Sequence, residues 1–311
     1  MALVATSADD GGTVTPQTVR SAVRALDRLG LEALAKRVET VDDWSQIALP
    51  CETITELTAL TARCRHRERL ADFVGPALGG LNAGVRALFK GPSGTGKTLA
   101  ARMIAGALGM ELYRVDLASV TNKYVGETEK SLERVFASAE ELDVVLLLDE
   151  GDALLTARTG VQSANDRYAN LETNFLLQRL EAYEGIIIAT TNAGDRIDGA
   201  FHRRMDVVVD FPLPDATQRW AIWRLHLPDS HDVDPELLQS AVQRCALTGG
   251  QIRNAALHAA LLAIENDSPI SSAHFVSAIE REYRKQGAVS PLRVKGVENN
   301  RSFAALRATR T

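Results

Sequence analysis

The chain has 311 residues, of which 45% are hydrophobic and 24% are charged, and its formal net charge at pH 7 is −5. These values are ordinary for a globular protein with a sizeable core, and the acidic balance argues against binding nucleic acid over a wide surface. No apolar run is long enough to cross a membrane, and the start lacks the basic region of a secretory signal, so we expect a cytoplasmic protein without membrane insertion.

The N-terminal part is expected to hold an arm and two helices. Residues 1–16 are small and polar, as in a mobile arm, and residues 15–38 place apolar side chains on one helical face. Residues 1–40 therefore form the first predicted segment, and a further helix is expected at about 52–73. The chain also carries three scattered cysteines without a CxxC pair, which are expected to be idle thiols: Cys51, Cys64 and Cys245.

From Val85 onward, short apolar runs alternate with helical patterns, which predicts a parallel α/β sheet. We predict an α/β domain over 41–213, with a five-stranded parallel sheet and helices on both faces. Only helical patterns follow, so a small all-α domain is predicted over 214–284, and residues 285–311 are expected to be a disordered tail. The expected strands are 87–90, 111–116, 144–149, 186–190 and 207–211.

The segment "GPSGTGKT" lies between the first of these strands and a helical pattern, and it matches G-x-x-x-x-G-K-[ST]. In such a loop, backbone N–H groups and the positive end of the following helix surround a phosphate group. Lys97 is expected to reach the β- and γ-phosphates, and the Thr98 hydroxyl to bind Mg²⁺. The residues expected to contact the nucleotide here are Gly91, Pro92, Ser93, Gly94, Thr95, Gly96, Lys97, Thr98 and Leu99.

A second polar group follows the buried strand 144–148, which ends in Asp149 and Glu150. Because ligands bind at the carboxyl ends of parallel strands, both carboxylates are expected to face the phosphate loop. Asp149 is expected to hold Mg²⁺, and Glu150 to polarise an attacking water. The simpler alternative is an acidic strand end followed by a helix that Asp152 caps. Asn192 ends the next apolar strand and is expected to hydrogen-bond the water or the γ-phosphate.

The chain resembles the AAA branch of the AAA+ ATPases from about residue 42 to residue 263. The adjacent arginines are spaced as in spastin and katanin, and the segment "DRYANLETNFLLQRLEAYEG" resembles a bacterial group of which some members accompany phage-tail-like contractile injection systems. The segments that carry the family resemblance are "GPSGTGKT", "KYVGETEKSL", "LLLDEGDALL", "ATTN", "AFHRRMD" and "FPLPDATQR".

The resemblance implies the P-loop NTPase fold and a homo-hexameric ring that binds ATP and Mg²⁺ at its subunit interfaces. Arg203 and Arg204 would then act on the γ-phosphate of the neighbouring subunit. Ile47 and Ala48 fall where the family packs the adenine, and Gly250 falls where a small residue of the helical lid contacts the nucleotide.

The resemblance also implies a protein or peptide substrate. Lys123, Tyr124 and Val125 match a loop that projects into the central channel of the ring and grips an extended peptide. The leading hypothesis is an ATPase that remodels or threads proteins. The alternative is a structural or capping ring that hydrolyses ATP slowly. A nucleic-acid motor is disfavoured by the acidic balance and by the aromatic residue of this loop.

Overall fold

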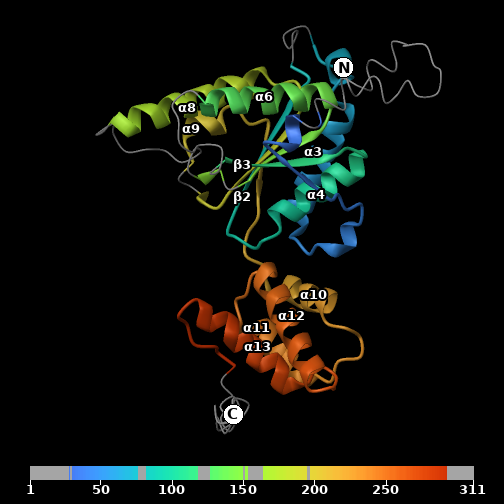
Figure 1. Cartoon of the computed structure of the whole chain (residues 1–311). Coiled ribbons are helices and arrows are strands. Elements are labelled where there is room, and N and C mark those ends of the chain that lie inside the picture. Colours follow the sequence, from blue (N-terminus) through green and yellow to red (C-terminus); the bar gives the residue numbers. More distant parts are fainter. Residues whose placement is uncertain are drawn as a thin grey trace, which may run out of the picture. The chain divides into compact units, whose positions relative to one another are not determined.

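The computed structural model describes residues 28, 30–75, 82–117, 127–149, 151–152, 164–194 and 197–292. The described residues fall into two compact units (Figure 1). The first contains the residues up to Gln218 together with Thr248–Gly250. The second contains Arg219–Leu247 and the residues from Gln251 onward.

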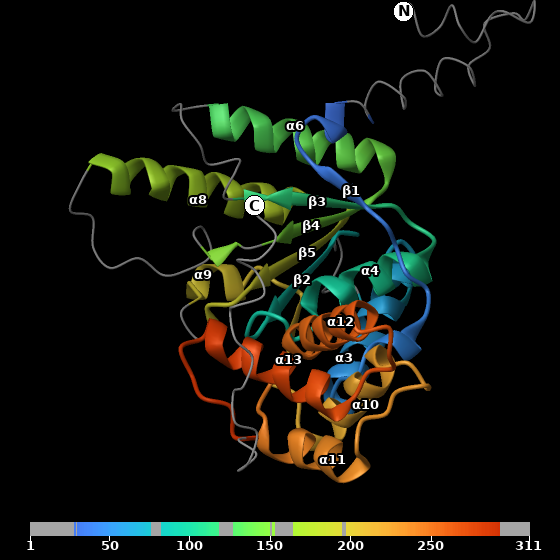
Figure 2. The same ribbon diagram turned by 60° about the horizontal axis from the view of Figure 1, so that its bottom comes forward.

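A six-stranded sheet with the order β1-β3-β4-β5-β2-β6 forms the centre of the first unit. Figure 2 shows β3, β4, β5 and β2 side by side in this order. The four pairs β3–β4, β4–β5, β5–β2 and β2–β6 are all parallel, which confirms the predicted five-stranded parallel sheet. The strands are β1 (Lys36–Val38), β2 (Val85–Lys90), β3 (Leu112–Asp116), β4 (Val145–Asp149), β5 (Ile186–Thr191) and β6 (Val207–Asp210).

The sixth strand, β1, was not expected, and the helix predicted over its residues is wrong. It pairs antiparallel with β3, and Lys36 lies opposite Arg114. Two of its three residues are charged, so its sequence carries no apolar alternation that would indicate a strand. The strand forms because the edge of β3 offers backbone hydrogen-bonding groups, and Arg37 adds an ion pair with Glu111 at 2.8 Å.

Helices cover both faces of the sheet, as predicted (Figure 1). Because successive strand residues point to opposite faces, Leu146 and Leu148 of β4 pack with α6 (Glu127–Leu142) and α8 (Ala164–Ala182). The alternate residues Val145 and Leu147 belong to the core on the other face. The helices of that face are α3 (Cys51–His66) and α4 (Lys97–Leu108), and the short helices of the unit are η1 (Trp44–Gln46), η2 (Leu70–Phe73) and α9 (Gly199–His202).

The segment predicted to be helical contains α10 (Ala216–His226), α11 (Pro235–Arg244), α12 (Gly249–Glu265) and α13 (Ser272–Lys285). In the second unit the rings of Trp223 and Phe275 pack with their centroids 4.7 Å apart. The buried positions of α12 are mostly alanines, which allow neighbouring helices to approach closely. Beyond α13, the side chains of Ser290 and Leu292 are buried, and the rest of the expected tail lies outside the described residues.

None of the helices that the structure describes has both the length and the apolar character needed to cross a membrane. All three cysteines are free; Cys51 is exposed, whereas Cys64 and Cys245 are buried. Burial raises the pKa of the Cys64 thiol to about 12, so this group stays protonated and unreactive near neutral pH.

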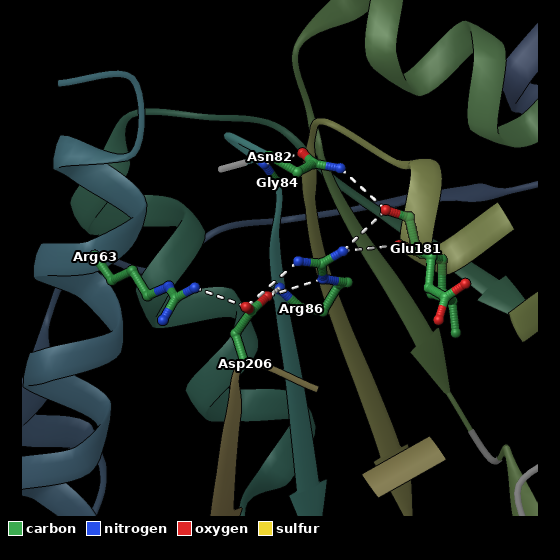
Figure 3. Close-up of polar contacts among 7 residues, drawn as sticks. Arg63, Asn82, Gly84, Arg86, Glu181 and Asp206 are labelled. Carbon is green, nitrogen blue, oxygen red and sulfur yellow. Dashed lines mark hydrogen bonds and ion pairs between the residues drawn. The ribbon is translucent and has the colours of Figure 1, made fainter. Parts of the chain in front are cut away.

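A polar cluster joins four elements where β2 and β6 begin, at the edge of the sheet away from the phosphate loop (Figure 3). Asp206 accepts hydrogen bonds from the backbone N–H and Nε of Arg86, both at 2.9 Å. Arg63 of α3 lies 2.7 Å from the same carboxylate. Arg86 Nη1 and Asn82 Nδ2 each donate to the Glu181 carbonyl at the end of α8, at 3.0 Å. The cluster therefore connects two helices, α3 and α8, to the beginnings of two strands, β2 and β6.

Replacing Asp206 with alanine should lower the free energy of unfolding by about 3–5 kcal/mol, because two arginines would lose their carboxylate in a largely buried place. The Arg86 side chain is 13% exposed and that of Asp206 is 16% exposed. Urea unfolding of the full chain, followed by circular dichroism, measures the change.

The matched control is Glu133→Ala, which removes an ion pair with Arg179 from a side chain that is 54% exposed. Exposed pairs are screened by water, so this loss should stay below about 1 kcal/mol. If both variants lost the same free energy of unfolding, the cluster would stabilise the fold no more than an exposed ion pair does.

Candidate functional site

The phosphate loop connects β2 to α4, and its backbone depends on glycines with positive φ, among them Gly91 and Gly96. Gly91 has φ = 148°, and a Cβ there would lie 2.1 Å from the carbonyl oxygen of Phe211. Gly96 has φ = 104° and directly precedes the first residue of α4. A side chain at either position would move the loop, because L-residues rarely adopt these angles and the space is filled.

The Lys97 ammonium lies inside this loop, and the residue is only 7% exposed. Its Nζ donates to the carbonyls of Gly91 at 2.5 Å and Pro92 at 2.9 Å, and to Asn192 Oδ1 at 2.9 Å. Burial lowers the pKa of Lys97, while the carboxylates of Asp152 and Asp149 oppose that shift. The loop and the end of β5 are therefore joined through one buried cation.

Asn192, just beyond β5, is held by Asp152. The Asp152 Oδ1 atom accepts from the Thr191 hydroxyl at 2.5 Å and from the Asn192 backbone N–H at 2.8 Å, and Oδ2 lies 3.3 Å from Asn192 Nδ2. Burial would raise the pKa of Asp152, but these hydrogen bonds outweigh it and the pKa is lowered. A helix cap was the simpler hypothesis for Asp152, and this contact with the next strand was not anticipated.

Asp149 ends β4 and is 7% exposed. Its Oδ1 accepts from the Thr190 hydroxyl at 2.5 Å, and its Oδ2 lies 2.9 Å from Arg114 Nε. The pairing of β3 with β4 sets this contact, because Arg114 lies opposite Leu147, two residues before Asp149. Arg114 was not singled out in the sequence, since an arginine within a strand belongs to no phosphate-binding motif.

The residues expected to hold Mg²⁺ suit that ion. Thr98 lies in the first turn of α4, and the Asp149 carboxylate lies at the same edge of the sheet. Within the described ranges, no three His, Cys, Asp or Glu side chains form a metal cluster. Mg²⁺ does not need one, because it keeps several waters and takes one or two protein oxygens plus those of the phosphates.

Two of the other residues expected to contact the nucleotide, Ile47 and Gly250, lie beside the loop. Ile47 Cδ1 is 3.3 Å from the point where a Cβ on Gly96 would be, and Ala48 is half-buried. The backbone N–H of Gly250 donates to the Gly94 carbonyl at 2.9 Å, so the segment with Gly250 contacts the phosphate loop directly. Ile47 thus lies beside Gly96, and Gly250 contacts Gly94.

The two adjacent arginines differ in their surroundings. Arg204 Nε lies 2.7 Å from the Glu181 carboxylate, and Arg204 Nη1 donates to the Ala200 carbonyl at 3.1 Å. Arg203 is exposed and forms no ion pair with a residue that the structure describes. Arg203 is therefore the more accessible of the two arginines. Glu150 and the segment with Lys123, Tyr124 and Val125 lie outside the described residues, so their expected roles stay predictions.

Comparison with known proteins finds similarity over the part of the chain that contains this site. Residues 87–213 match the model of the family "ATPase family associated with various cellular activities (AAA)". The chain is 34% identical over 208 residues to the ATPase family gene 2 protein homolog A of Homo sapiens. The aligned region covers 62% of this chain and 23% of that protein.

Two bacterial relatives show similar identity. The uncharacterized AAA family ATPase y4kL of Sinorhizobium fredii is 32% identical over 208 residues, covering 65% of this chain and 61% of that protein. The ATP-dependent zinc metalloprotease FtsH 3 of Sphaerobacter thermophilus is 34% identical over 205 residues, covering 62% of this chain and 41% of that protein. The similarity thus spans less than two thirds of each of these three relatives. The phosphate loop, Asp149 and Asn192 all lie inside residues 87–213, so the segment that matches the AAA family model contains the candidate site.

Proposed function

We propose that the chain binds Mg²⁺–ATP at the phosphate loop and hydrolyses it to ADP and phosphate. The observation that carries the proposal is the 2.9 Å contact between Lys97 Nζ and Asn192 Oδ1, with Asp149 at the end of the adjacent strand β4. This contact brings the phosphate-binding lysine and the polar end of β5 to the same point. ATP-dependence in the name of the FtsH relative, and the family match, support the same activity.

Each residue has a defined task in this proposal. The loop N–H groups and Lys97 bind the phosphates, and Lys97 exchanges carbonyl acceptors of its own loop for phosphate oxygens. When bound, Mg²⁺ neutralises charge on the phosphate oxygens, and Asp149 and Thr98 would hold it. Glu150 takes a proton from the attacking water, and Asn192 orients that water or the γ-phosphate.

The proposed active unit is a homo-hexameric ring in which Arg203 and Arg204 serve the neighbouring subunit's ATP. Charge spreads over the phosphoryl oxygens during the transfer, and arginine binds such oxygens with a planar, permanently charged group. The exposure of Arg203 supports this role. The Glu181 contact means that Arg204 must either leave its partner or act from beside it.

The proposed work of the ring is remodelling or threading of a protein or peptide, gripped by Lys123, Tyr124 and Val125. The alternative is a capping ring that hydrolyses ATP slowly. The spastin- and katanin-like arginine spacing, the cytoplasmic location and the link to a contractile injection system rest on the sequence alone. Tail-tube and sheath genes beside the coding gene would support the last of these.

Glu150→Gln should leave ATP binding intact and lower turnover by at least about 100-fold, because an amide cannot accept the proton of the attacking water. The measurement combines the affinity for a fluorescent ATP analogue with the rate of phosphate release. Lys97→Ala is the control, since it should lose affinity as well. Wild-type turnover in Glu150→Gln would remove this carboxylate from the mechanism.

Mixing two inactive variants tests whether the arginines act across an interface. Lys97→Ala subunits lack a phosphate site, and Arg203→Ala subunits lack the exposed arginine. Each alone should lose on the order of 10³-fold or more in turnover. Mixed rings contain some interfaces with both parts intact, so the rate of phosphate release should partly recover.

The same mixture with Arg204→Ala tells which arginine acts in trans. Recovery with one arginine variant and not with the other assigns that role. Co-assembly is checked by mass photometry. Failure to recover in either proven mixed ring speaks against action between subunits, as does turnover per subunit that does not rise with protein concentration.

Tyr124→Ala should leave basal ATPase close to wild type and abolish processing of an unfolded protein, because an aromatic side chain provides most of the grip on an extended peptide. The assays are ATPase stimulation by an unfolded polypeptide, with single-stranded DNA in parallel, and unfolding of a tagged fluorescent substrate. Absence of polypeptide stimulation in the wild type would favour the capping ring, and stimulation by DNA would contradict the choice of a protein substrate.

A further inference from the structure

We propose that Asp152 is a positioning residue for the ATPase site: its carboxylate selects the orientation of the Asn192 amide that faces an acceptor oxygen toward Lys97. The inference rests on the proposed function, in which Lys97 and Asn192 act on the phosphates. It assigns a task to a carboxylate that the phosphate-binding motifs leave without one.

The inference rests on a chain of hydrogen bonds that connects Asp152 through Asn192 to Lys97. Asp152 holds both ends of Asn192, the backbone N–H at 2.8 Å and the side-chain Nδ2 at 3.3 Å. The Thr191 hydroxyl, on a fully buried residue, donates to Asp152 at 2.5 Å and fixes the carboxylate. On the far side of the same amide, Asn192 Oδ1 accepts from Lys97 Nζ at 2.9 Å.

The two possible orientations of the amide differ sharply in energy. In the observed one, Nδ2 donates to a carboxylate and Oδ1 accepts from an ammonium, so both contacts are attractive. Turning the amide over would place N–H groups against the ammonium and a carbonyl oxygen against the carboxylate. An ionised carboxylate can only accept hydrogen bonds, so Asp152 allows one orientation and excludes the other.

The orientation matters because it sets where the lysine lies. Two acceptors of Lys97 belong to the phosphate loop, and the third, Asn192 Oδ1, belongs to a residue just beyond the buried strand β5. That third acceptor ties Nζ to the end of β5, which lies beside β4 and Asp149. Loss of the selected orientation should therefore reduce the catalytic step more than nucleotide binding, which the loop N–H groups also support.

The experiment is a double-mutant cycle in the full chain with Asp152→Asn, Asn192→Ala and the combined variant. Asp152→Asn keeps the size of the side chain and removes the charge, so the Asn192 amide loses its carboxylate partner and is oriented by Lys97 alone. We expect kcat to fall about 10- to 100-fold, as for loss of a hydrogen bond to a charged group, while the ATP affinity changes less than about threefold. Because Asp152 acts through Asn192, the combined variant should match Asn192→Ala alone.

A control variant separates this role from general structural support. Asp234 accepts from the Glu236 N–H at 3.2 Å at the start of α11 in the second unit, so it is a capping aspartate outside the site. Asp234→Asn should leave kcat within about twofold of wild type, as expected of a cap whose loss costs only stability. Combined with Asn192→Ala, its effect should multiply.

The outcomes are decisive in each direction. Multiplying losses for Asp152→Asn with Asn192→Ala, or wild-type kcat in Asp152→Asn, would overturn the inference. Should Asp152→Asn not fold by circular dichroism, Thr191→Val takes its place, since it removes the hydroxyl that fixes the carboxylate and keeps the side-chain volume. The same partial loss of kcat, absent in the Asn192→Ala background, is then expected, and multiplying losses again contradict the inference.

Failure of the proposed function gives a different signature. If wild type and Lys97→Ala release phosphate at the same rate, the chain is not an ATPase of the proposed kind, whatever Asp152 does. The free energy of unfolding is then measured for the same variants. If Asp152 and Asn192 are in contact, the loss in the combined variant differs from the sum of the two single losses. Additive unfolding energies would contradict the contact itself.

Discussion

Parallel pairing of β4, β5 and β2 brings three polar segments to one edge of the sheet. Leu148 of β4 lies opposite Ala189 of β5, and Thr191 of β5 lies opposite Lys90 of β2. The residues that follow these pairs are Asp149, Asn192 and the phosphate loop, so the strand register alone sets their mutual distance. Every feature of the candidate site depends on that register, including the hydrogen bond from Thr190 to Asp149.

The register also explains why the site holds so many charges that offset one another. Lys97 is surrounded by carbonyls and by two nearby carboxylates, and Asp149 is offset by Arg114. Lys97 and Asp149 are largely withdrawn from water, and an unpaired ion in such a place would be costly. In the proposed function, a triphosphate with its metal would therefore enter a site whose charges are already paired. Binding would replace some of these contacts with contacts to the phosphates and the metal. The contacts that change belong to the phosphate loop and to the ends of β3, β4 and β5.

The sequence indicates the central strands and the phosphate loop well because each is a local pattern. Apolar runs such as 145–149 and 186–191 are buried on both faces, and glycine, lysine and threonine at fixed spacing define the loop. Local patterns fail where a partner distant in the chain decides the structure. β1 exists only through pairing with β3, and Arg114 and Asp152 gain their roles from neighbouring strands. The greater exposure of Arg203 than of Arg204 likewise depends on Glu181, far away in sequence.

The short strand β1 has a mechanical consequence. It is joined to the sheet by three residue pairs with β3, by the ion pair of Arg37 with Glu111, and by the ion pair of Arg28 with the same carboxylate. These pairs are few and lie at the edge of the sheet, so β1 opens at lower cost than the five parallel strands. Tension applied through the residues ahead of β1 would pull Leu31 and Ala35 out of the core and peel this strand away before the parallel strands separate. The edge of β3, beside the arginine that holds Asp149, would be uncovered while the ATPase core stays folded.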